Sequence, residues 1–363
     1  MKYSRKEIDK AGKTVITEKD TTKVNEALNK INDWRQLHLA PLDLLQVGIL
    51  NILKVNNQKI VFVSRRLKRL TSILYKLDLN PKMGLGGMQD IGGLRIVLSD
   101  IGNLYRTLDI LKANVPESFT LKEKINDYVE LPKESGYRSI HLVYKYHSED
   151  TYDGMNIELQ IRTKLQHSWA MAVETAGLVT KTPLKSSQGE EAWLNFFKIV
   201  SSLFAIKEEK PIMYEHQVKG WGMKDLMKLL YNVDNKHNFS YQLKALRISV
   251  NYAKTNNITN GYYILDINFI TQMVHISAYE NEQEEEASST YSKMEKEVED
   301  SKNAVVLVSV PKMVELQEAY PSYFLDTKDF LNAIDPKFPN ITMLLWLNYN
   351  NILVFSILCL AYL

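Results

Sequence analysis

The chain has 363 residues, which is long enough for two domains with separate cores. Its 45 Lys and Arg residues against 43 Asp and Glu residues leave a formal net charge of +2, which excludes a strongly basic or acidic protein. The single cysteine, Cys359, excludes an intramolecular disulfide, and the charged start without an apolar stretch behind it indicates no secretory signal, so we expect a cytoplasmic protein.

The first 55 residues are predicted to be helical. Ser4 and Glu7 fit a capping box at the start of a first helix, and a second helix is expected to begin at Thr21 or Thr22. Pro41 suits the first turn of a third helix with a largely apolar sequence. We interpret the three helices as a packing subdomain, with the alternative that their charged face also contacts a substrate.

Four cations crowd into residues 65–69, where we predict the start of a helix whose leucine and isoleucine residues face the core. A run of charges is usually a solvated surface. Like charges at this spacing repel one another unless an anion lies between them. The segment therefore has two interpretations, an exposed basic face and a binding site for phosphate.

A glycine-rich stretch at residues 84–88 lacks the Lys-Ser/Thr ending of a phosphate-binding P-loop, so we predict a connector there. Asp90 follows it and stands at the beginning of an apolar strand, predicted over residues 91–98. A carboxylate at the edge of an apolar strand is costly to bury unless it binds a cation. We therefore expect Asp90 to have a partner of positive charge.

A second strand is predicted around Glu158, Gln160 and Arg162, which alternate with apolar residues and share one face. We interpret that face as a floor for a charged substrate. Upstream, Gly136 gives backbone freedom to a loop that presents Tyr137. Helices are predicted at residues 164–177 and 190–207, and the charged end of the second marks a domain boundary near residue 210.

Three segments, in this order and at this spacing, resemble the synthetase domain of RelA/SpoT-type enzymes. They are Asp-Ile-Gly-Gly-Leu-Arg-Ile at 90–96, Gly-Tyr-Arg-Ser-Ile-His at 136–141 and Glu-Leu-Gln-Ile-Arg-Thr at 158–163. The resemblance covers residues 45–210 and implies an α/β fold of the nucleotidyltransferase-like type, a mixed sheet flanked by helices. It also implies an enzyme that moves the β,γ-pyrophosphate of ATP onto a ribose hydroxyl of an acceptor.

The resemblance also implies roles for individual residues. Asp90 and Glu158 are expected to be catalytic and to bind Mg²⁺, with Glu158 as a second metal ligand or as the general base on the acceptor hydroxyl. The expected ATP contacts are Arg66, Lys68, Ser72 and Lys76. The acceptor base is expected to stack on Tyr137, within a group completed by Lys133, His141, Gln160 and Arg162.

Residues 211–340 are predicted to form a separate control module without a catalytic constellation. A helix is expected over residues 223–255, then strands at 261–267 and 273–279, a helix at 280–302 and a strand at 304–310. Short helices at residues 313–320 and 326–334 complete it. The ββαβ order favours a small sheet with one helix across it.

Tyr320 and Tyr323, held by Pro321, belong to the end of this module. On their own they are better explained as core or interface residues than as a functional motif. With the order of elements around them, they resemble the C-terminal antitoxin half of fused toxic small alarmone synthetases of the CapRel type, in which a Tyr-x-x-Tyr motif fills the adenine pocket. This resemblance implies an autoinhibited toxin–antitoxin enzyme of phage defence. The enzyme would be activated by a phage protein such as a capsid protein, and the active enzyme would block translation.

Two acceptors remain open. The toxic relatives modify the 3′-terminal adenosine ribose of tRNA, whereas ordinary (p)ppGpp synthetases use GDP or GTP. Alarmone synthetases commonly carry a basic residue just before Asp-Tyr, and Asn126 stands in that place here. The substitution removes a cation expected to bind the diphosphate of GDP or GTP, which favours tRNA.

The tail at residues 341–363 has no charged residue, and its length matches a bilayer span, although asparagines interrupt it. Three interpretations stay open: a helix packed on the module, which we favour, a membrane anchor, and a sequence end outside the functional fold. We expect a monomer.

Overall fold

The computed structural model describes residues 2–149, 152–180, 184, 187, 189–245, 249–252, 261–268, 271, 273–297, 303–310 and 315–334. The apolar tail at 341–363, with its three interpretations, lies outside the described residues.

The N-terminal region forms the three predicted helices, α1 (Arg5–Thr17), α2 (Thr21–Gln36) and α3 (Leu39–Val55). The capping box is confirmed, because the Ser4 backbone N–H donates to the Glu7 carboxylate at 2.8 Å and Ser4 Oγ accepts from the Glu7 backbone. Within the described residues, one helical stretch, Thr21–Val55, is long and apolar enough to cross a membrane. This is weak support for a span, since buried core helices pass the same test.

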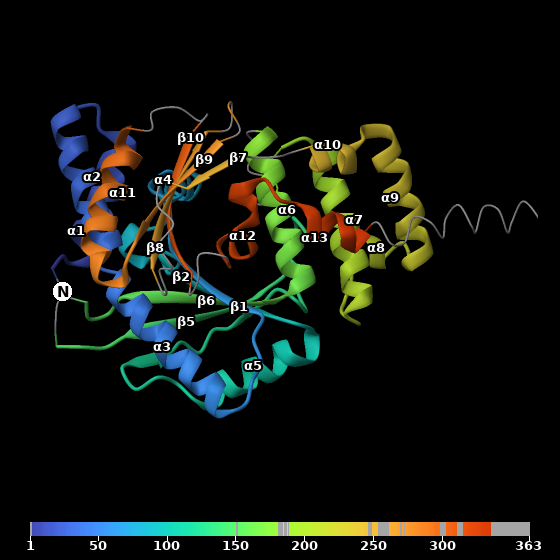
Figure 1. Ribbon diagram of the computed structural model, residues 1–363, viewed down its shortest axis with the longest axis horizontal. Helices are drawn as coiled ribbons and strands as arrows, with labels where there is room; N and C mark the ends of the chain where they lie inside the picture. The colour runs from blue at the N-terminus through green and yellow to red at the C-terminus, as the bar shows by residue number, and fades with distance from the viewer. Residues whose placement is uncertain are drawn as a thin grey trace, which may run out of the picture.

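A mixed sheet runs through the molecule and confirms the predicted α/β class (Figure 1). Among the described residues its strand order is β3-β5-β6-β2-β1-β10-β8-β9-β7, with β4 paired to β5. The pairs β2–β6 and β7–β9 are parallel and the others antiparallel. The strands are β1 (Phe62–Leu67), β2 (Gly92–Leu98), β3 (Phe119–Leu121), β4 (Asn126–Asp127), β5 (Ile140–Tyr146), β6 (Asn156–Thr163), β7 (Ser249–Tyr252), β8 (Tyr262–Asn268), β9 (Met273–Tyr279) and β10 (Asn303–Ser309).

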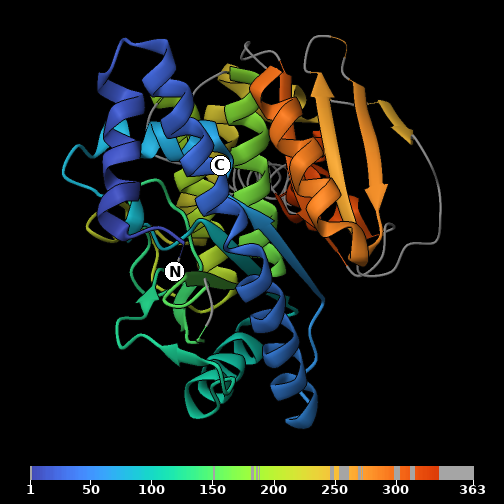
Figure 2. The same cartoon turned by 90° about the vertical axis from the view of Figure 1, so that its left-hand side faces the viewer.

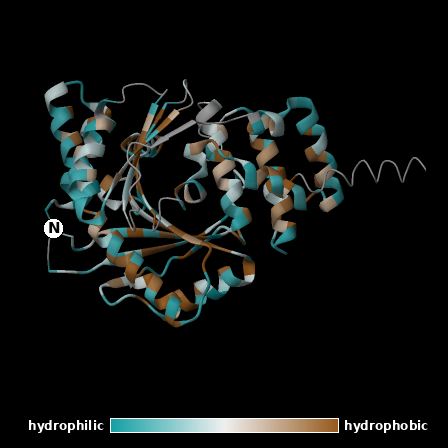
Figure 3. Ribbon diagram, viewed as in Figure 1, coloured by the Kyte–Doolittle hydropathy of each residue, from teal (hydrophilic) through white to brown (hydrophobic). Residues whose placement is uncertain are grey.

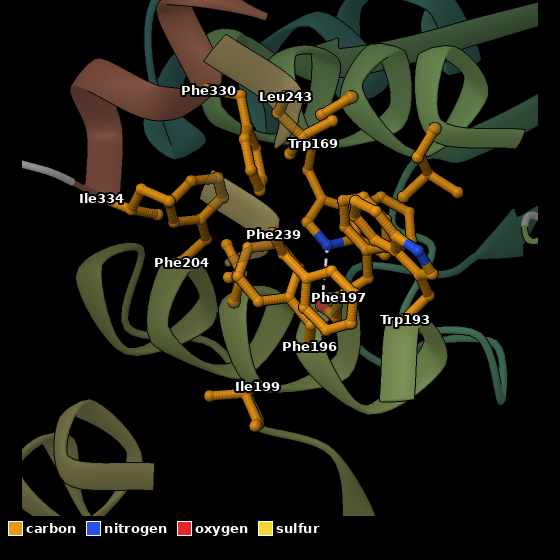
Figure 4. Close-up of a cluster of buried hydrophobic side chains, with 14 of the residues drawn as sticks. Trp169, Trp193, Phe196, Phe197, Ile199, Phe204, Phe239, Leu243, Phe330 and Ile334 are labelled. Atoms are coloured by element: carbon orange, nitrogen blue, oxygen red, sulfur yellow. Dashed lines mark hydrogen bonds between the residues drawn. The ribbon is translucent and has the colours of Figure 1, made fainter. Parts of the chain in front are cut away.

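Helices cover both faces of the first-half strands. One face carries α3 and α5 (Ile101–Ala113), which enclose a core of aliphatic residues with the sheet (Figures 1 and 3). The other face carries α6 (Lys164–Thr180), and behind it α7 (Glu191–Lys207) packs with the later helices around an aromatic cluster (Figure 4). In that cluster the Trp169 indole donates to the Phe197 carbonyl at 2.8 Å, which fixes α6 against α7.

The remaining helices of the described structure range from three residues in η1 to 15 residues in α9. They are α4 (Leu70–Leu79), η1 (Leu85–Gly87), α8 (Tyr214–Gln217), α9 (Met223–His237), α10 (Phe239–Ala245), η3 (Asn281–Gln283), α11 (Glu284–Glu297), α12 (Leu316–Ala319), η5 (Pro321–Phe324) and α13 (Lys328–Ile334).

The helix predicted over the basic run is wrong at its start. Residues 62–67 form β1, which pairs with β2 on one side and with β10 on the other. Arg65 and Arg66 therefore point to opposite faces of the sheet, and helix α4 begins only at Leu70. The leucines at 67 and 70 are compatible with one continuous helix and equally with a strand followed by a helix. The pairing of β1 with β2 and with β10 selects the strand.

The helix predicted over residues 223–255 is also wrong in its second part. Helix α9 ends at His237, and Asn238 after it has a φ of 56° in the left-handed region that terminates helices. Helix α10 follows, and β7 lies inside the range predicted to be helical. Strand β7 exists because β9, which comes later in the sequence, offers it a parallel partner.

The ββαβ order of the second half is confirmed by the antiparallel pair β8–β9, helix α11 and strand β10. The small sheet is not separate, however, because β10 pairs with β1 at Arg65–Ser309 and Arg66–Val308. In Figure 2, α11 lies between the orange strands of the second half and the blue N-terminal helices. The second half thus extends the sheet of the first, and the boundary near residue 210 stays a prediction.

Candidate active site

Three polar side chains of β6 form one hydrogen-bonded row, which confirms the strand predicted from their alternation. Gln160 Nε2 donates to Glu158 Oε1 at 2.5 Å, and Arg162 Nη2 donates to Gln160 Oε1. Arg162 is fully buried. Glu158 and Gln160 are half-buried, so the row leads from the interior at Arg162 to a partly accessible carboxylate at Glu158.

Glu158 is linked to Tyr137 through His141 of β5. The distances are 3.1 Å from His141 Nδ1 to Glu158 Oε2 and 2.9 Å from His141 Nε2 to the Tyr137 hydroxyl. Burial works to raise the pKa of Glu158, but the hydrogen bond and charge of His141 outweigh it, so the pKa is lowered. Burial works to lower the pKa of His141, and Tyr137 and Glu158 outweigh it, so that pKa is raised. The two groups thus hold each other in their charged forms.

Tyr137 is only 3% exposed, although the sequence predicted an open aromatic face. The Lys133 ammonium lies 5.3 Å and the Arg162 guanidinium 5.6 Å from its ring centroid. Both cations lie against the ring, so a base can stack on Tyr137 only after one of them moves. Asn126 lies close by, because it pairs with His141 in the ladder between β4 and β5.

Asp90, just before β2, is paired with two lysines that the sequence assigned to ATP. Lys68 Nζ and Lys76 Nζ each lie 2.9 Å from an Asp90 carboxylate oxygen. Burial works to raise the pKa of Asp90, and the two ammonium groups outweigh it and lower the pKa well below its ordinary value. The charge of Asp90 opposes the lowering of the Glu158 pKa, so the two carboxylates are close enough to interact electrostatically.

Asp90 and Glu158 are the residues that would hold a Mg²⁺ ion. Hard cations prefer carboxylate oxygens, and Mg²⁺ is usually held by one or two carboxylates together with substrate phosphates. Both oxygens of Asp90 are engaged by ammonium groups in this structure. The ion therefore fits once Lys68 or Lys76 turns from Asp90 toward a phosphate group.

Three arginines from three neighbouring strands share the face of the β6 row. In the ladders, Arg66 of β1 lies opposite Gly93, and Arg95 of β2 lies opposite Gln160. Burial lowers the pKa of Arg95 to about 10, with a further contribution from the charges of Arg162 and Arg66. Within the described structure, Arg95 Nε and two nitrogens of Arg162 have no hydrogen-bond partner. Buried cationic donors without partners favour an anionic ligand.

Tyr320 and Tyr323 lie against these arginines. Arg66 Nη1 donates to the Tyr323 hydroxyl at 2.9 Å, and the Arg95 guanidinium lies 5.9 Å from the Tyr320 ring centroid. The Tyr320 hydroxyl donates to the backbone carbonyl of Arg65 at 2.5 Å. Both rings are buried and stacked on each other with centroids 6.0 Å apart. The structure thus brings the two tyrosines to the predicted ATP side of the site.

Two residues of the site were missed at the sequence level. Glu174 of α6 lies 3.6 Å from Arg66 Nη1, and Arg95 stands between Arg66 and Arg162. Arg95 belongs to the motif at 90–96 and is a polar residue in an apolar strand, a signal that could have found it.

Of the predicted ATP residues, Ser72 is half-buried in the first turn of α4.

Comparison with known proteins supports an assignment. A family model described as a region found in RelA / SpoT proteins matches residues 65–179. GTP pyrophosphokinase YjbM of Bacillus subtilis (strain 168) is 30% identical over 176 residues, 46% of this chain and 82% of that protein.

The chain belongs to the RelA/SpoT family.

This RelA/SpoT protein is a pyrophosphokinase. GTP pyrophosphokinase YwaC of the same organism is 32% identical over 112 residues, 29% of this chain and 52% of that protein. Among solved structures, small alarmone synthetase 1 of Bacillus subtilis bound to its product pppGpp is 27% identical, with a TM-score of 0.37, and covers 48% of this chain and 86% of that one. Small alarmone synthetase 2 is 24% identical with a TM-score of 0.42, covering 49% and 93%. The family assignment rests on the sequence match.

Proposed function

We propose that this pyrophosphokinase is held inactive by its own second half, in the manner of fused toxic small alarmone synthetases of the CapRel type. The observation that carries the proposal is the contact of Tyr323 with Arg66, together with Tyr320 beside Arg95. Guanidinium groups stack on planar rings and fork onto phosphate oxygens. ATP and the tyrosine segment, residues 320–323, therefore compete for the same arginines.

In the open enzyme, Arg66, Lys68, Ser72 and Lys76 bind ATP, and Asp90 holds Mg²⁺ beside Glu158. When bound, the ion neutralises and orients the polyphosphate. Lys68 and Lys76 neutralise Asp90 in the closed enzyme. With ATP present, these ammonium groups turn to the phosphate oxygens, so the closed site already contains the charges that ATP needs.

Glu158 is proposed as the general base. It is ionised at neutral pH because His141 lowers its pKa. Glu158 takes the proton of the acceptor ribose hydroxyl as that oxygen bonds to the β-phosphorus of ATP. The bond from the β-phosphorus to the bridging oxygen of the α-phosphate breaks, and AMP leaves.

The proposed acceptor is the 3′-terminal adenosine ribose of tRNA, whose modification blocks translation. Asn126 pairs with His141 at the acceptor side, where a basic residue would bind the diphosphate of GDP or GTP. A terminal adenosine has no 5′-diphosphate and does not need that cation. The alternative, (p)ppGpp synthesis from GDP or GTP, is favoured by the relatives YjbM and YwaC, each named a GTP pyrophosphokinase.

A labelling assay tests the acceptor. Purified Tyr320→Ala/Tyr323→Ala protein is incubated with ATP labelled at the γ-phosphate and with deacylated tRNA, GDP or GTP. We expect label on tRNA, and none on tRNA whose 3′-terminal ribose has been opened with periodate. Label on GDP or GTP, with none on tRNA, would establish the alternative.

A phage protein such as a capsid protein is proposed to release the tyrosine segment in the cytoplasm, where the enzyme acts as a monomer. A groove of about 770 Å³ lies behind the segment, between Tyr241 and Lys244 on one side and Phe324 and Asp326 on the other. A partner shifts the equilibrium only if it binds the open state better than the closed one. Binding in this groove would satisfy that condition if it displaced η5.

A further inference from the structure

The junction between β1 and α4 carries the residues assigned to ATP. Arg66 lies in β1, Lys68 lies in the junction itself, and Ser72 and Lys76 follow in α4. The N-cap residue of α4, Arg69, makes no side-chain capping bond of its own. A helix start without a cap leaves backbone N–H groups to be satisfied by another part of the protein.

That cap comes from the second half of the chain. Glu295 Oε1 of α11 accepts the backbone N–H of Leu70, the first residue of α4, at 2.9 Å. The Tyr291 hydroxyl donates to the same oxygen at 2.7 Å. A carboxylate at a helix N-terminus is stabilised by the peptide dipoles as well as by the hydrogen bond. Helix α4 is therefore held at its start by a residue 225 positions later in sequence.

Arg35 of α2 completes the arrangement on the other side of the junction. Its Nε donates to the Lys68 backbone carbonyl at 3.0 Å, and Nη1 donates to Glu295 Oε2 at 2.7 Å. Its Nη2 donates to the Tyr291 hydroxyl at 2.7 Å. The Lys68 N–H in turn donates to the Ile91 carbonyl at 2.8 Å, next to Asp90. Both backbone groups of Lys68 are thus fixed.

The ion pair is deeply buried, with side-chain exposures of 2% for Arg35 and 8% for Glu295. Buried pairs of this kind add little stability over apolar residues of the same size, but loss of one partner leaves an unpaired charge. Arg35 donates to the Lys68 backbone carbonyl, and Glu295 accepts from the Leu70 backbone N–H. The pair therefore binds the backbone on either side of Arg69. An ion pair that only filled space in the core would not need hydrogen bonds to both of these backbone groups.

We propose that Glu295, together with Arg35, is a positioning residue for the ATP side of the active site. It sets the junction so that Lys68 and Lys76 reach Asp90. This inference rests on the proposed assignment of these lysines to ATP. It gives the second half a double role, since α11 supports the site that the tyrosine segment closes. Activation then displaces α12 and η5 while α11 stays in contact with α2 and α4 (Figure 1).

The test is direct binding of a nucleotide that cannot be turned over. The dissociation constant of α,β-methylene-ATP with Mg²⁺ is measured by calorimetry on the full chain carrying Tyr320→Ala/Tyr323→Ala. Adding Glu295→Gln or Arg35→Lys is expected to weaken binding by about tenfold, which corresponds to about 1.4 kcal/mol. The two changes together are expected to weaken it no more than either alone, because both act on one junction.

Glu284→Gln is the matched control. Glu284 is a carboxylate of the same helix that accepts a hydrogen bond from Tyr262 at 3.0 Å, within the second half. We expect it to leave nucleotide binding unchanged. For all variants the KM of the acceptor should change less than about twofold, because a general loss of folded protein would affect both substrates.

Unchanged nucleotide binding in folded Glu295→Gln protein overturns the proposal, and so does an equal loss for nucleotide and acceptor. If that variant does not fold, Arg35→Lys decides. Hydrogen exchange at the amides of residues 70–73 is a second readout, expected to be about fivefold faster in Glu295→Ala, which removes the acceptor of the Leu70 N–H, as for loss of an N-cap of about 1 kcal/mol. Unchanged exchange there also overturns it. Failure of the autoinhibition proposal would show as absent turnover in the tyrosine variant. Calorimetry and hydrogen exchange do not require turnover, so they still test the role of Glu295 in that case.

Discussion

His141 and Glu158 form a buried pair whose charge state depends on pH. The raised pKa of His141 contributes stability that is fully present below its ordinary value of 6.5 and is lost as pH rises through the raised value. The lowered pKa of Glu158 contributes stability that is present above its ordinary value of 4.5 and is lost as pH falls through the lowered value. The pair is therefore strongest between these two ordinary values.

This window gives a prediction for stability. Replacing His141 with Gln should lower the melting temperature most near about pH 5.5, and the difference from the wild type should shrink as the pH rises through the raised pKa of His141. Thermal unfolding followed by circular dichroism at a series of pH values measures it. A difference that is the same at every pH would mean that the imidazole is neutral in the folded protein.

Asp90 and Glu158 test the chemistry at the same scale. Asp90→Asn and Glu158→Gln keep side-chain volume, so we expect folded proteins that have lost pyrophosphate transfer by at least about a hundredfold, the lower range for a lost acid–base group. The measurement is label transfer in the Tyr320→Ala/Tyr323→Ala background. Asp100→Asn, which changes an exposed N-cap carboxylate of α5, is the control and should retain activity. Full activity of either site variant would contradict the two-carboxylate mechanism.

At the scale of elements, the sequence predicts well where one local pattern decides. The polar row on β6 followed from alternation alone, and α1 to α3 followed from caps and apolar spacing. It failed at residues 65–67 and 249–252, where partners distant in sequence hold strands that have no clear period of their own. The closed state of Tyr137 depends on its contacts with Lys133 and Arg162, which no local pattern encodes. Arg95, by contrast, could have been found as a polar residue in an apolar strand.

The loop that presents Tyr137 depends on one glycine. Gly136 has a φ of +90°, and a Cβ placed there would lie 3.0 Å from Ser201 Cβ and 3.2 Å from the Trp169 ring. Gly136→Ala should therefore cost about 1–2 kcal/mol from the backbone alone and displace Tyr137. Chemical denaturation measures the free energy of unfolding. Gly87→Ala, where a Cβ would have nothing within 4 Å, is the control and should be nearly neutral.

At the scale of the whole molecule, the two halves share one sheet through the ladder between β1 and β10. Arg66 on that strand also binds Tyr323, so the contact proposed to inhibit the enzyme and the ladder that joins the halves involve the same strand. Separating the halves would break the ladder and remove the support that α11 gives to α4. Activation is therefore expected to be local, with release of α12 and η5 from a sheet that stays intact.

Replacing both Tyr320 and Tyr323 with Ala should leave the enzyme active without a trigger. The reason is that both rings leave the arginines, and Arg66 and Arg95 become free to bind ATP. In cells we expect growth arrest on induction, measured against the wild-type chain, and normal growth when Glu158→Gln is added to the double variant. Tyr75→Ala, on the partly exposed surface of α4, is a matched loss of one ring outside the inhibitory segment and should not cause arrest. A double variant that is folded but harmless, and that transfers no pyrophosphate when purified, would leave the two tyrosines as packing residues of the core.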